Sequence, residues 1–190
     1  MNTMKKIGIN VAILACFLAV AACNGTQNKD SAEMAEERNE EIHDDTALED
    51  DSEFVVEAAD GGMLEVKLGE LAQERGLSPH VKSFGEKMAQ EHGKANEELK
   101  ALAKEKNLQL PSQLSDDKQK HFDDLSMKNG KEFDEAYAAL MVDDHEEDVK
   151  AFKEAAEESH DPEVKAWAAG KVPTLESHLT MAKKLKEQVK

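Results

Sequence analysis

The amino-acid sequence predicts an all-α protein whose folded part is a four-helix bundle. Aromatic residues make up 4% of the 190 residues and there are only four prolines, a composition that disfavours β-sheet. Four long segments carry apolar residues at helical spacing and are joined by short or moderate connections. Such helices bury their apolar faces most simply against one another in a bundle. A coiled-coil dimer is the weaker alternative, because the chain contains no long run of heptads.

The chain begins with the features of a secreted lipoprotein. Two lysines precede an apolar run over residues 7–22, which is short for a membrane span and typical of a signal peptide. The run ends in Val-Ala-Ala-Cys at residues 20–23, which resembles a bacterial lipobox. We therefore predict a lipoprotein signal peptide over residues 1–22 and a lipidated Cys23 that anchors the protein in a membrane. An ordinary signal peptide with an incidental cysteine is the alternative.

The residue after the predicted anchor indicates a location in the cell, and the net charge excludes some classes of binding partner. Asn24 follows Cys23 in place of the aspartate that retains enterobacterial lipoproteins in the inner membrane, which favours the outer membrane, on its periplasmic or its surface side. The only other cysteine is Cys16, so no disulfide framework is expected. A formal net charge of −17 argues against binding to nucleic acid or to anionic lipid surfaces. The expected partner is the membrane, through the lipid anchor, and the sequence identifies no protein partner.

The segment after the anchor, residues 23–51, is predicted to be a disordered acidic tether. It is rich in Asp and Glu and has almost no large apolar residues. A segment of this composition buries too little apolar surface to offset the entropy lost on ordering. The bundle is therefore expected to occupy residues 52–190.

The first long helix is predicted to start after residues 51–52, where Asp or Ser can cap it, and to end at Arg75. Gly76 suits the position after a helix end. Gly61 and Gly62 are expected to weaken this helix near its middle and to permit a kink.

The second long helix has a clear beginning, with Ser78 as the N-cap and Pro79 at the first helical position. It is predicted to run to about Lys106, where Asn107 closes it. Residues 108–115 form a connector.

Two further long helices follow a short one. The short helix is predicted over residues 116–127, and the third long helix over residues 131–159. The fourth opens at Asp161-Pro162, again a cap followed by a proline. Pro173 is expected to kink it, because proline cannot donate a hydrogen bond to the preceding turn.

Each long helix carries a polar residue on or beside its apolar face, at a similar depth along the helix. These residues are Glu65, His92, His145 with Asp148, and His178. Because all of them lie near mid-helix, they should meet at one level of the bundle whichever way each helix runs. Imidazoles and carboxylates that converge inside a bundle can form a metal site. The pattern is consistent with one transition-metal ion held by these five residues as ligands or as their hydrogen-bonding partners.

Other interpretations of the same residues stay open. A closed hydrogen-bond network would satisfy the buried imidazoles and carboxylates without metal. The histidines could also act as a pH switch that loosens the bundle when they titrate near neutrality. Glu91 and Asp144 are expected to be solvated and His43 and His80 to be exposed, and His121 belongs to the short helix. Methionines at helical spacing suggest copper, but such residues usually fill cores.

Five ordered motifs resemble those of a bacterial family. They are Glu65-x-x-x-Gly69-x-Leu71-Ala72, Met88-x-x-Glu91-His92-x-x-x-Asn96-x-x-Leu99-x-x-Leu102-Ala103, Phe133-Asp134-x-x-Tyr137, His145-x-x-Asp148-x-x-x-Phe152 and Pro173-x-Leu175-x-x-His178-Leu179. This set is similar to the bacterial domain of unknown function 4142, a family often described as a predicted outer membrane protein and placed in the ferritin-like superfamily. The resemblance implies an envelope-located, ferritin-like four-helix bundle, and it implies no established activity.

The sequence departs from the di-iron pattern of ferritin-like enzymes, which use Glu-x-x-His on two helices. His145 and His178 have Val142 and Leu175 where that pattern needs glutamate. No nucleophile–base pair, phosphate-binding loop or cofactor fingerprint is present either. The sequence therefore favours a non-catalytic binding or structural module in the cell envelope, with a mononuclear metal-binding protein as the alternative.

Overall fold

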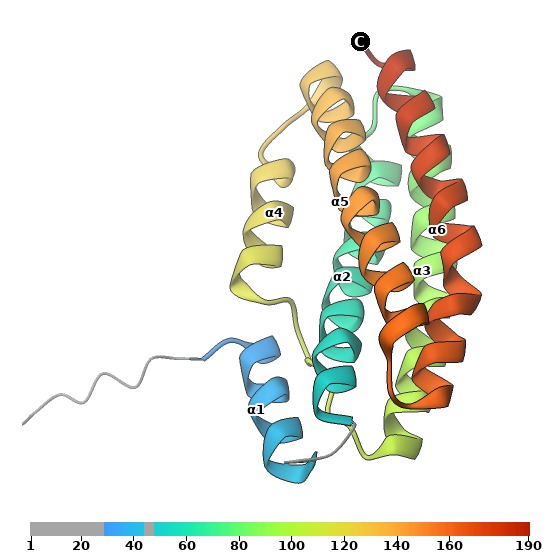
Figure 1. Cartoon of the computed structure of the whole chain (residues 1–190). Helices are drawn as coiled ribbons and strands as arrows, with labels where there is room; N and C mark the ends of the chain where they lie inside the picture. Colours follow the sequence, from blue (N-terminus) through green and yellow to red (C-terminus); the bar gives the residue numbers. More distant parts are fainter. Residues whose placement is uncertain (1–28, 44–47) are drawn as a thin grey trace, which may run out of the picture.

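The structure of the protein is a computed structural model that describes residues 29–43 and 48–190. The described residues form six α-helices and no strand (Figure 1). The helices are α1 (Ser31–His43), α2 (Leu48–Arg75), α3 (Pro79–Lys106), α4 (Asp116–Ser126), α5 (Gly130–Glu158) and α6 (Pro162–Gln188). The all-α prediction is confirmed. The predicted signal peptide and lipidated Cys23 lie outside the described residues.

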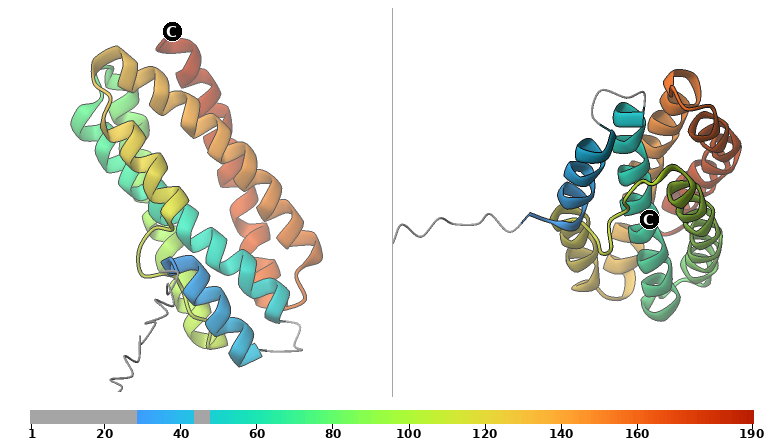
Figure 2. Two further views of the ribbon diagram at one scale, coloured as in Figure 1. Left: turned by 90° about the vertical axis from the view of Figure 1, so that its left-hand side faces the viewer. Right: turned by 90° about the horizontal axis from the view of Figure 1, so that it is seen from below.

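The bundle consists of two antiparallel helical hairpins that face each other. Helix α2 packs most extensively against α3, and α5 packs most extensively against α6. Helix α4 runs beside the bundle and joins the end of α3 to the start of α5 at the opposite end (Figures 1 and 2). None of the helices in residues 29–43 and 48–190 is long and apolar enough to span a bilayer. The two ends of the bundle are the α2–α3 end and the α5–α6 end, each called after the turn that it contains.

Local sequence signals account for the helix ends as predicted. The Ser78 side chain accepts a hydrogen bond from the His80 amide (3.2 Å), and Asn107 closes α3 in the left-handed conformation with φ 59°. The Asp161 carboxylate accepts from the amides of residues 163 and 164 and so caps α6. These capped starts fix where α3 and α6 begin, and hence where the middle of each lies.

Two helices continue through the residues at which a kink is predicted. Helix α2 continues through Gly61 and Gly62, and α6 continues through Pro173. Gly62 also leaves room for a neighbour, because a Cβ atom there would lie 2.1 Å from Oδ1 of Asn96 on α3. This glycine therefore serves the packing of α2 against α3.

The prediction of a disordered tether over residues 23–51 is wrong for residues 31–43 and 48–51, which are helical. Helix α1 packs against α2 and is also held by polar contacts to the connector between α3 and α4. The buried Asn39 amide donates to the Gln109 carbonyl (3.0 Å) and accepts from the Gln109 amide (2.6 Å). Ser31 Oγ accepts from the Ser112 amide (2.8 Å). Because the prediction relied on apolar residues, it could not detect a helix anchored in this way.

Each hairpin turn is held by a buried carboxylate from the other hairpin. Asp51, at the start of α2, accepts from the amides of residues 160 and 161 in the α5–α6 turn (3.1 and 2.6 Å). Asp134, at the start of α5, accepts from the amides of residues 77 and 78 in the α2–α3 turn (2.9 and 2.7 Å). Both carboxylates are at least 95% buried. These reciprocal contacts fix the axial register of the hairpins, and hence the level at which mid-helix side chains meet.

Candidate metal centre

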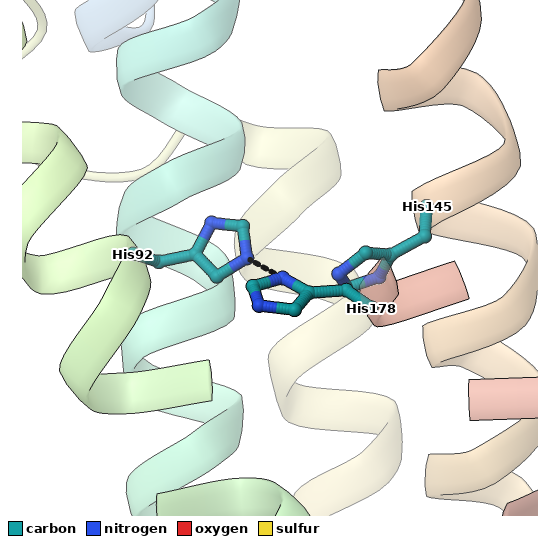
Figure 3. Close-up of side chains that lie close together, drawn as sticks. All are labelled: His92, His145 and His178. Atoms are coloured by element: carbon teal, nitrogen blue, oxygen red, sulfur yellow. Dashed lines mark hydrogen bonds between the residues drawn. The ribbon is translucent and has the colours of Figure 1, made fainter. Parts of the chain in front are cut away.

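Three buried histidines from three different helices face one another in the middle of the bundle. His92 comes from α3, His145 from α5 and His178 from α6. Their exposed fractions are 6%, 0% and 1%. Figure 3 shows the three rings converging on a common point. The ring centroids form a nearly equilateral triangle with sides of 5.2, 5.4 and 5.6 Å.

The triangle has the dimensions of a three-imidazole metal site. An ion with metal–nitrogen distances of about 2.0–2.1 Å in tetrahedral geometry separates its nitrogen ligands by about 3.3 Å and the ring centres by about 5.2 Å. His92 Nε2 and His178 Nδ1 lie 3.3 Å apart. One nitrogen from each of the three rings lies within 4.8 Å of the others. The rings can therefore coordinate one ion without a large rearrangement.

The outer nitrogen of each ring lies against an oxygen acceptor. His145 Nδ1 donates to the Met141 carbonyl oxygen (2.9 Å), and His178 Nε2 lies 2.5 Å from Glu91 Oε2. His92 Nδ1 is in contact with Glu65 Oε2. Metal-binding histidines commonly hold their second nitrogen in this way, because the outer hydrogen bond fixes the tautomer and leaves the inner lone pair for the ion.

Burial keeps the three imidazoles neutral at pH 7. It lowers the pKa of His92 to about 4 and that of His178 to about 4. Burial also lowers the pKa of His145, against the opposing effect of the Glu65 carboxylate. A neutral imidazole is the form that binds a metal ion.

Glu65 is a fully buried carboxyl group from α2 that bridges two of the histidines. Its Oε1 lies 3.2 Å from His145 Nε2, and its Oε2 contacts His92. Burial raises the pKa of Glu65 to about 8, against the opposing effect of His145. Neither Glu65 oxygen nor His145 Nε2 has a hydrogen-bond partner of good geometry. Unpartnered buried polar atoms are rare in folded proteins, and an ion bound at this point is one explanation for them.

Comparison with known proteins places the chain in a family. The family model described as "Domain of unknown function (DUF4142)" matches residues 35–185. The protein belongs to the DUF4142 family. Its fold is similar to that of a DUF305 protein from Streptomyces coelicolor that is described as secreted, with 17% sequence identity and a TM-score of 0.59. The match covers 73% of this chain and 93% of the other and supports the helical fold alone. Comparison with curated proteins gives no match. The ferritin-like relationship stays a prediction.

The structure of this DUF4142 protein brings together four of the five residues singled out in the sequence. Glu65, His92, His145 and His178 contact one another at one level. Asp148 lies one helical turn further along α5, outside the histidine triangle, and lines a neighbouring cavity. His80 is exposed as predicted and His121 is exposed too, whereas His43 is half-buried at the end of α1.

Of the two carboxylates predicted to be solvated, Asp144 is instead buried: it is 7% exposed and lies 3.5 Å from the ammonium group of Lys118 on α4. Glu91 is half-buried and contacts His178, a contact that the sequence analysis did not foresee. Lys118 received no role in the sequence analysis. The periodicity of one helix shows which face is apolar, but it does not show which charged residue a neighbouring helix will bring to the edge of that face.

Proposed function

We propose that this protein is a metal-binding module of the cell envelope, and that its bundle holds one transition-metal ion between His92, His145 and His178. The observation that carries the proposal is the triangle of neutral imidazoles, in which each inner nitrogen faces the centre and each outer nitrogen lies against an acceptor. Three imidazoles suit Zn²⁺ and Cu²⁺. The role that we propose for the centre is binding of the ion.

A metal-free hydrogen-bond network satisfies the same atoms less well. His145 Nδ1 must donate to the Met141 carbonyl, and His178 Nε2 donates to the Glu91 carboxylate, so neutral His145 and His178 each have only a lone pair on the inner nitrogen. If His92 donates to His178, its own outer nitrogen becomes a lone pair that faces Glu65. Glu65 then faces two lone pairs, on His92 and His145, with at most one proton to donate. A metal ion at the inner nitrogens removes this deficit.

Metal stoichiometry tests the proposal. We expect the full-length protein, purified without chelators and titrated with Zn²⁺, to bind one ion per chain. A variant that carries His92→Ala, His145→Ala and His178→Ala should lose this ion, and the single substitution His178→Leu should weaken binding at least 100-fold. The matched control carries His80→Ala, His121→Ala and His160→Ala, three exposed histidines, and should bind as the wild type does. Equal binding by the control and the centre variants would place the metal elsewhere.

We also propose that the protein is attached to the outer membrane through a lipid on Cys23. The lipobox-like residues 20–23 support this proposal. Two or more acyl chains hold a protein stably at a membrane, whereas one chain does not. We expect radiolabelled palmitate to label the wild-type protein in cells and Cys23→Ser to abolish both labelling and membrane sedimentation. Cys16→Ser is the control, and undiminished labelling of Cys23→Ser would exclude this anchor.

A further inference from the structure

A cavity of about 540 Å³ adjoins the histidine centre on one side only. Glu65, His92 and His178 form part of its wall. Most of its other lining residues lie between these three side chains and the α5–α6 end of the bundle. They include Ala58 and Gly62 on α2, Ala95 and Asn96 on α3, Phe152 on α5, and Trp167 and Leu175 on α6. This volume is within the range of about 300–1,000 Å³ that is usual for small-molecule sites.

The other side of the centre is closed by the main apolar core. Met88 and Met141 lie one helical turn from His92 and His145 toward the α2–α3 end, and both are fully buried. Leu68 occupies the same position relative to Glu65 and is also fully buried. Glu65 contacts the outer nitrogen of His92, and in this arrangement it accepts from that nitrogen and does not bind the ion. An ion held by the three imidazoles then keeps one tetrahedral position for a further ligand. Because one side is packed and the other is hollow, that position faces the cavity.

The lining of the cavity selects the chemistry of a ligand. Phe152, Trp167 and Leu175 provide an aromatic and aliphatic wall. Burial raises the pKa of Glu65 and of Asp148, which favours their neutral forms, and the other two lining carboxylates are balanced by Lys94 and Lys171. The lining therefore offers no excess of positive charge to hold an anionic ligand. An uncharged molecule with one metal-binding atom and an apolar body fits both the wall and the charge.

We propose that, with the metal in place, the cavity binds an uncharged aromatic nitrogen base whose nitrogen takes the fourth coordination position and whose apolar body packs on Phe152, Trp167 and Leu175. This proposal rests on the metal site proposed above. Binding combines one coordinate bond to the metal with the burial of an aromatic ring in the cavity. Removing the metal and filling the cavity should therefore each weaken binding.

Cobalt-loaded full-length protein provides the test, because the visible spectrum of Co²⁺ reports a change in its ligands. We expect 4-phenylimidazole to change the spectrum and to bind at least tenfold more tightly than imidazole, and azide to bind more weakly than imidazole. Trp167 is the only tryptophan, so its fluorescence gives a second readout. In metal-free protein, this readout should show at least tenfold weaker binding of 4-phenylimidazole.

Filling the cavity separates this proposal from the metal site itself. Ala95→Phe places a ring in the cavity and should retain Co²⁺ but lose at least 90% of the affinity for 4-phenylimidazole. Ala101→Phe, at an exposed position on the same helix, is the control and should bind both as the wild type does. Co²⁺ binding with no preference for 4-phenylimidazole over imidazole, or with full affinity in Ala95→Phe, would overturn the cavity proposal alone. Failure to bind Co²⁺ would overturn both proposals.

Discussion

Saturating Zn²⁺ is expected to raise the midpoint temperature of thermal unfolding by about 10 °C, because an ion present at about 1,000 times its dissociation constant stabilises the native state by about 4 kcal/mol. The effect arises from the position of the ligands. His92 belongs to the α2–α3 hairpin, whereas His145 and His178 belong to the α5–α6 hairpin. The ion can bind all three only when the hairpins are docked, so its binding free energy contributes to folding.

The substitution His178→Leu should reduce this shift to less than about 2 °C, since two imidazoles bind the ion far more weakly than three. The metal-free variant should remain folded, because the loss of one buried hydrogen-bond partner costs about 1–3 kcal/mol, less than the roughly 5–15 kcal/mol by which a domain is stable. His80→Leu, at an exposed position on α3, is the control and should keep the full shift. A shift of equal size in His178→Leu, measured by calorimetry at the same Zn²⁺ concentration, would disprove this coupling.

Gly69→Ala is expected to lower the free energy of unfolding by about 1 kcal/mol, since overpacking costs about 1–3 kcal/mol and about 1 kcal/mol of that is regained from the helix propensity of alanine. A Cβ atom on Gly69 would lie 2.5 Å from the carbonyl oxygen of Gly85 and 2.8 Å from the amide nitrogen of Ala89. Both of these atoms belong to the backbone of α3 and cannot move aside independently. Helices α2 and α3 would have to separate at the closest point of their contact.

Gly170→Ala is the matched control for this substitution. Gly170 also lies inside a long helix, but a Cβ atom there would have no neighbour within 4 Å. We expect this variant to be more stable than the wild type by about 0.5–1 kcal/mol, because alanine favours the helix without a steric cost. Urea denaturation of both variants gives the comparison. If Gly69→Ala is as stable as Gly170→Ala, the close approach of α2 and α3 at Gly69 is wrong.

The sequence predicted the position of the site along the bundle axis better than it predicted the residues that surround the site. Helix caps such as Ser78 and Asp161 locate helix starts, and counting from them places Glu65, His92 and His178 at similar depths. This count holds because an α-helix rises by a constant distance of about 1.5 Å per residue. It requires no knowledge of which helices are neighbours.

Features that depend on neighbouring helices could not be predicted from periodicity. The contact between Glu91 and His178 requires that α3 and α6 be adjacent. Helix α1 is held by hydrogen bonds from Asn39 to a connector 70 residues away, which leave no apolar pattern in the sequence. The contact at Gly69 involves residues without side chains and leaves no such pattern either. In each case the deciding interaction joins residues that are far apart in the chain.

The most direct test of the central claim is a crystal structure of the Zn²⁺-loaded protein with anomalous diffraction data collected at the zinc absorption edge. We predict one anomalous peak in the bundle, at about 2.0–2.1 Å from one ring nitrogen of each of His92, His145 and His178. We also predict that the His145 Nδ1 hydrogen bond to the Met141 carbonyl is retained. Anomalous peaks confined to surface carboxylates, with the three imidazoles bonded only to one another and to Glu65, would contradict the account.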